Sequence, residues 1–141
     1  MTANPDEHKW ALDTAEALRN GQFTNVDVSA IAAHIHGIAA SLQREIRARF
    51  RNAVFFWMCK RSARSQKEFD EIRWIVLDNP SILSAITQED LDQSYALALD
   101  LFETMKDDYD ESKLGRGSKV PVKNPYSLDW IMNHDDLPAL P

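Results

Sequence analysis

The sequence predicts an all-α protein, a four-helix-bundle-like single domain with a long central helix and a short C-terminal docking segment. Two long apolar stripes support this class, because their residues recur every three to four positions, the period of one side of an α-helix. No stretch alternates apolar and polar residues as a half-buried strand would. The stripes are Ile31, Ile35, Ile38, Leu42, Ile46, Phe50, Ala53 and Trp57, and Leu91, Tyr95, Ala98, Phe102, Met105 and Tyr109.

Size and composition fit one globular domain over residues 1–141. The chain has 141 residues, of which 44% are hydrophobic and 27% charged, as in ordinary folded domains. No apolar run approaches the roughly 18 residues that span a bilayer. Cys59 is the only cysteine, so no internal disulfide can form, and the sequence predicts a cytoplasmic protein without a membrane partner.

Local signals set the expected helix ends. Asn4 before Pro5 is a helix start, Gly21 is the matching stop, and Trp10 is the expected anchor of this first helix on the core. The central helix is expected to begin with Thr24 or Asp27 as its cap.

Further along, the polar residues around Ser65 predict a bend or break, and Cys59 is interpreted as a small core residue. Thr87 and Asp90 have the spacing of a capping box at the start of the second stripe. A mobile loop is expected near 113–120, and Ser127 is expected to cap a short docking helix.

Three stretches resemble a known bacterial family, the one numbered 29 among the domains of unknown function. Residues 10–27 are similar to its opening helix and turn, and residues 79–83 to its central Pro-Ser-Leu turn. The segment 121–138 is similar to its closing part. These motifs are structural, so the resemblance implies a helical fold and assigns no residue a chemical role.

The sequence does not favour an enzyme or a cofactor. His34 and His36 are two positions apart and so diverge by about 200° on a helix, which disfavours a shared metal ion. The acidic run 107–111 lacks the glycine turn of a calcium loop. We therefore predict no catalytic, cofactor or metal residues and keep a metal-dependent activity as a third alternative.

Charge is unevenly distributed in a chain whose net charge is −6. The segment 44–73 holds nine Lys/Arg against four Asp/Glu, whereas 78–111 holds ten Asp/Glu against one Lys. Two complementary helices explain this pattern, and a nucleic-acid-associated protein that uses the segment 44–73 is the alternative. On a straight helix Arg44, Arg47 and Arg51 fall on the outer half, while Arg49 points near the stripe.

Small residues form a second face of the central helix. Ala33, Gly37 and Ser41 are spaced by four and allow close approach of another backbone. Because glycine inside a helix costs roughly 1 kcal/mol relative to alanine, this face is expected to pack, either on the first helix or on a second copy.

The sequence thus favours a non-enzymatic protein-interaction or structural module with an unknown protein partner or a homodimer. The residues predicted to take part in interactions are Ala33, Gly37, Ser41, Arg44, Arg47 and Arg51.

Overall fold

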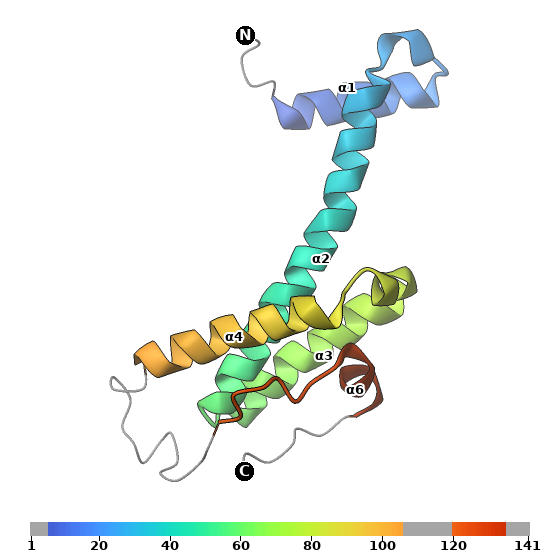
Figure 1. Cartoon of the computed structure of the whole chain (residues 1–141). Helices are drawn as coiled ribbons and strands as arrows, with labels where there is room; N and C mark the ends of the chain where they lie inside the picture. The colour runs from blue at the N-terminus through green and yellow to red at the C-terminus, as the bar shows by residue number, and fades with distance from the viewer. Residues whose placement is uncertain (1–5, 106–119, 135–141) are drawn as a thin grey trace. The chain divides into compact units, whose positions relative to one another are not determined.

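A computed structural model describes residues 6–105 and 120–134. Every regular element within these ranges is helical, which confirms the all-α prediction. Contacts divide the chain into two compact units, Met1–Ala39 and Ala40–Pro141. Helix α2, Val28–Met58, runs through both (Figure 1). The prediction of a single domain over 1–141 stays a prediction.

The first unit contains α1 (Glu7–Arg19), the short 3-10 helix η1 (Phe23–Asn25) and the start of α2. The side chain of Asp6 caps α1 by accepting a hydrogen bond from the Lys9 N–H at 3.1 Å. The sequence predicts Asn4 as this cap, but the acceptor is the Asp6 carboxylate. Asn4 itself lies outside the described residues. Gly21 ends the turn after α1 as predicted, with a φ of 68°, a conformation that glycine adopts at little cost.

Trp10 packs within the first unit rather than in the main core. Its ring centroid lies 5.4 Å from that of His34. The residues of the main core cluster all belong to the second unit, and Ala17 is the only buried residue of α1. The expected anchoring of α1 on the core through Trp10 is therefore replaced by a local contact with the beginning of α2.

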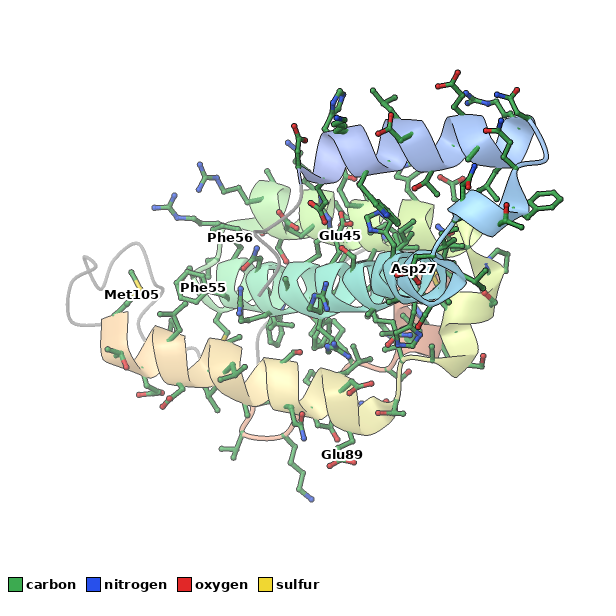
Figure 2. The ribbon with its side chains drawn as sticks, turned by 90° about the horizontal axis from the view of Figure 1, so that it is seen from above. Asp27, Glu45, Phe55, Phe56, Glu89 and Met105 are labelled. Carbon is green, nitrogen blue, oxygen red and sulfur yellow. The ribbon has the colours of Figure 1, made fainter. Side chains whose placement is uncertain are left out.

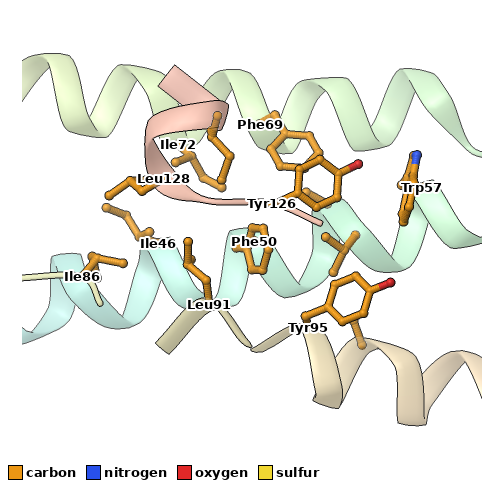
Figure 3. Close-up of a cluster of buried hydrophobic side chains, with 14 of the residues drawn as sticks. Ile46, Phe50, Trp57, Phe69, Ile72, Ile86, Leu91, Tyr95, Tyr126 and Leu128 are labelled. Atoms are coloured by element: carbon orange, nitrogen blue, oxygen red, sulfur yellow. The ribbon is translucent and has the colours of Figure 1, made fainter. Parts of the chain in front are cut away.

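The second unit packs the C-terminal half of α2 with α3 (Ser62–Asp78), η2 (Pro80–Ser84) and α4 (Gln88–Met105). The C-terminal segment adds α6 (Leu128–Asn133) to this core. Figure 3 shows Tyr126 of this segment among aromatic side chains from α2 and α3. Its ring centroid lies 6.0 Å from Phe50, 5.4 Å from Trp57 and 5.2 Å from Phe69. Such aromatic clusters bury large areas and favour edge-to-face contacts.

The break after α2 lies at residues 59–61, not near Ser65. Lys60 has a φ of 57° and separates the end of α2 from the start of α3. Ser65 is fully buried inside α3, where its hydroxyl donates to the Ala53 carbonyl at 2.6 Å. The polar side chain therefore joins two helices instead of ending one. Cys59 is buried as expected, and this burial raises the pKa of its thiol.

Three predicted caps are confirmed by hydrogen bonds. Asp27, and not Thr24, accepts from the Ala30 N–H at 3.0 Å at the start of α2. Thr87 and Asp90 form the reciprocal capping box of α4, with bonds of 3.1 and 3.0 Å. The Ser127 hydroxyl accepts from the Trp130 N–H at 3.0 Å and caps α6.

Polar contacts hold the docking segment in place. The Tyr95 hydroxyl donates to the Pro121 carbonyl at 2.5 Å. Arg73 donates to the Ile131 carbonyl at 2.7 Å and to the His134 carbonyl, so a cation meets the carbonyl end of α6. The predicted loop at 113–120 lies outside the described residues except for Val120, and the acidic run 107–111 lies wholly outside them.

Two tyrosines in this core should respond oppositely to loss of the hydroxyl. The Tyr126 hydroxyl is buried without a hydrogen-bond partner among the described residues, and burial raises its pKa. Tyr126→Phe should therefore maintain the free energy of unfolding or raise it by up to about 1 kcal/mol, because desolvation of an unpaired hydroxyl is unfavourable. Tyr95→Phe should lower it by about 1 kcal/mol, because its bond to Pro121 is lost. Urea denaturation of both variants checks this, and equal destabilisation would contradict it.

Candidate interaction surfaces

All six residues predicted to take part in interactions lie on α2, on two different parts of it. Ala33 and Gly37 belong to the first unit, and Ser41 follows at the start of the second. Arg44, Arg47 and Arg51 come from the next two turns. The small residues and the arginines therefore belong to separate surfaces.

The small-residue face is open. Ala33, Gly37 and Ser41 are exposed. Apart from the adjacent residues and backbone of α2 itself, no described heavy atom lies within 4 Å of the position that a Cβ would take at Gly37. Of the two partners considered from the sequence, the first helix of the same chain therefore does not pack on Gly37. Gly37 has room for a larger side chain.

The apolar stripe of α2 is buried in its second half, whereas in its first half Ile31 is half-buried and Ile35 and Ile38, with Val28 one turn before the stripe, are exposed. Ile46 and Phe50, in the second unit, have no solvent exposure. In the first unit Val28 is 70% exposed, Ile35 61% and Ile38 56%. These three residues are separated by steps of seven and three, so they share one side of the helix. We call them the open stripe.

The open stripe lies in a stretch without charge. Between Val28 and Gln43 the sequence contains no Asp, Glu, Lys or Arg. A helix usually carries charged residues on the side that faces water, whereas the centre of a protein interface is depleted of charged residues. This gap in the charge pattern is a signal that the sequence analysis missed, because it followed the spacing of the apolar residues and not the absence of charge beside them.

The arginines line a groove to which both α2 and α4 contribute residues; Figure 2 shows these two helices with their side chains as sticks. Its volume is about 270 Å³. The residues that line it are Arg44, Arg47, Ala48 and Arg51 of α2 and Asp90, Gln93, Ser94 and Leu97 of α4. The three arginines predicted to share the outer half of the helix thus face one groove. We call it the arginine groove.

Three other cations of the segment 44–73 contact neighbouring side chains and do not line this groove. Arg49 donates to Glu45 at 3.0 Å and to Glu68 at 3.2 Å, and these bonds raise its pKa. Arg73 binds Asp70 at 2.8 Å. Arg64 lies 5.4 Å from the centre of the Phe56 ring.

Asp90 is the only acid that lines the groove. Its carboxylate accepts a hydrogen bond from the Thr87 N–H, which lowers its pKa together with the nearby guanidinium of Arg47. The distance from its Oδ1 to the Arg47 guanidinium is 3.8 Å, which is long for an ion pair. No ion pair of Arg44 or Arg51 is found in the described ranges. The groove therefore carries uncompensated positive charge.

The described residues contain no group of three or more His, Cys, Asp or Glu side chains placed to hold a metal ion. His34 and His36 are both exposed. Within the same ranges, no helix has the length and apolar content needed to cross a bilayer.

Replacement of Asp90 by Asn should test the cap at the groove. Because the pKa of Asp90 is lowered in the folded state, its carboxylate stabilises the fold above its unfolded pKa and loses this effect as the pH falls through the folded pKa. At pH 7 the variant should lose roughly 0.3 to 1 kcal/mol. The difference should shrink below about pH 4. Asp100→Asn removes the same charge from an exposed position outside the cap and should leave the free energy of unfolding at pH 7 nearly unchanged; equal losses for the two variants in urea denaturation would contradict the assignment.

Comparison with known proteins adds the family and no activity. No curated protein and no solved structure matches the chain. One family model matches residues 4–137, nearly the whole sequence, and its description is Domain of unknown function DUF29. The match confirms the resemblance inferred from residues 10–27, 79–83 and 121–138. The chain belongs to the DUF29 family.

Proposed function

We propose that this chain is a non-enzymatic, cytoplasmic protein-interaction module that self-associates through the first half of α2. The observation that carries the proposal is the open stripe, three large apolar side chains that are each more than half exposed. Exposed apolar residues that are grouped on one helix side mark interaction sites more often than isolated ones. The single, buried Cys59 thiol agrees with a reducing compartment.

A second copy is the occupant that the chemistry of this surface favours. The stretch from Val28 to Gln43 has no formal charge, so it offers nothing to recognise a charged partner and repels no copy of itself. A two-fold contact places the same patch of each subunit against the other. Burial of the open stripe of both copies then removes apolar area from water at about 25 cal/mol per Å².

Replacement of two residues of the open stripe should weaken the association. Ile35→Gln with Ile38→Gln keeps good helix formers and replaces apolar surface by polar surface. We expect the wild type to be dimeric at about 100 µM and this double variant to be monomeric, because a shift of a few kcal/mol changes the Kd by two or more orders of magnitude. Light scattering coupled to size-exclusion chromatography measures the mass directly.

Two control variants make the result specific. Leu77 and Leu83 are 62% and 47% exposed in the second unit, so Leu77→Gln with Leu83→Gln removes comparable apolar surface and should leave the dimer intact. Gly37→Leu places a large side chain on the exposed small-residue face and would block a close contact there. Loss of the dimer in Gly37→Leu alone would place the contact on the small-residue face instead. A wild type that remains monomeric at 100 µM and above contradicts self-association.

Association with nucleic acid is a second candidate, supported by the three arginines that line one groove. If phosphates bind there, affinity for a random DNA duplex should fall steeply with salt, with a slope close to the number of phosphates contacted. Arg44→Gln with Arg51→Gln should reduce that slope by about two. Fluorescence anisotropy with a labelled duplex at several salt concentrations measures the slope, and affinity that does not vary with salt eliminates this candidate.

A further inference from the structure

We infer that the arginine groove binds an acidic peptide segment of another protein. This site is separate from the open stripe, and neither proposal depends on the other. The inference starts from the balance of charge in the groove. Three arginines and a single carboxylate line it, and that carboxylate, Asp90, already accepts the Thr87 N–H as part of the α4 cap.

The spacing of the arginines suits several carboxylates at once. Arg44, Arg47 and Arg51 follow at steps of three and four, so they lie on one side of α2 over about 10 Å of helix length. Each guanidinium presents a planar set of donors that matches a carboxylate with two parallel hydrogen bonds. Arg44 and Arg51 are exposed and form no ion pair with a described residue, so both are available to a ligand.

Leucines beside the arginines favour a peptide over nucleic acid. Leu97 lines the groove and is 58% exposed, and Leu101 follows one turn later on α4 with 42% exposure. An apolar side chain of a peptide gains from covering these leucines, whereas a phosphate backbone does not. A ligand with acidic and apolar residues therefore fits both walls of the groove.

The charge of α4 also restricts the size of an anionic ligand. From Gln88 to Met105 this helix carries five acidic residues and no Lys or Arg. A long polyanion that extends past the groove meets this negative helix, while a short peptide can confine its carboxylates to the α2 wall. The groove thus selects a short acidic segment.

A synthetic peptide tests this inference on the full-length chain. The probe is a fluorescein-labelled ten-residue peptide with four Glu and two Leu, and binding is followed by fluorescence anisotropy at low salt. We expect saturable binding that weakens at least tenfold in Arg44→Gln with Arg51→Gln. Lys9→Gln with Lys67→Gln removes the same charge from exposed positions outside the groove and should change the affinity less than twofold.

Two further probes identify the chemistry. A peptide with Gln in place of Glu should not bind, and one with Ser in place of Leu should bind at least threefold more weakly. The inference is overturned if the wild type does not bind the acidic peptide, or if both double variants weaken binding equally. It is also overturned if a labelled ten-nucleotide single strand binds more tightly than the peptide and loses affinity in Arg44→Gln with Arg51→Gln.

Discussion

The fold of the second unit depends on covering the apolar side of α2 from Ile46 to Trp57. A helix cannot bury its own apolar side, so α3, α4 and the C-terminal segment together cover this side of α2. Tyr126 completes it by placing an aromatic ring against Phe50 and Phe69, as Figure 3 shows. The hydrogen bonds that fix the segment carrying Tyr126 therefore support this core by holding the ring in place.

In the first unit the apolar residues of α2 are more exposed to solvent than in the second. There α1 contacts α2 through Trp10 and His34, and the residues of the open stripe face solvent. One helix thus combines a half that is closed by its own chain with a half that is free of charge and uncovered. The proposed self-association follows from this difference, because a second copy supplies the apolar surface that the described part of the chain does not.

The sequence alone predicted those features that depend on contacts between residues close together in the chain, such as helix caps. The caps at Asp27, Thr87 and Ser127 rest on side chains that bond to backbone groups three positions away, so their signals are local. The break near Ser65 was placed wrongly because the partner of its hydroxyl, the Ala53 carbonyl, lies on another helix. The family resemblance agrees with the helical fold predicted from the apolar stripes, since its motifs are turns and helix ends.

The candidate sites were only partly predictable for the same reason. Periodicity placed Arg44, Arg47 and Arg51 on one side of α2. The groove also requires residues of α4, and the position of α4 next to α2 depends on tertiary packing, which periodicity does not predict. The pattern that makes a helix amphipathic does not state whether its apolar side is covered within the chain, as Ile38 and Ile46 illustrate.

Hydrogen exchange at two protein concentrations tests the central claim most directly, since it reports on both halves of α2 in one experiment. Self-association through the open stripe predicts slower amide exchange for residues 28–39 at high concentration. It also predicts unchanged exchange for residues 46–58, which the core already protects. Exchange of residues 28–39 that is equally fast at both concentrations would contradict the account.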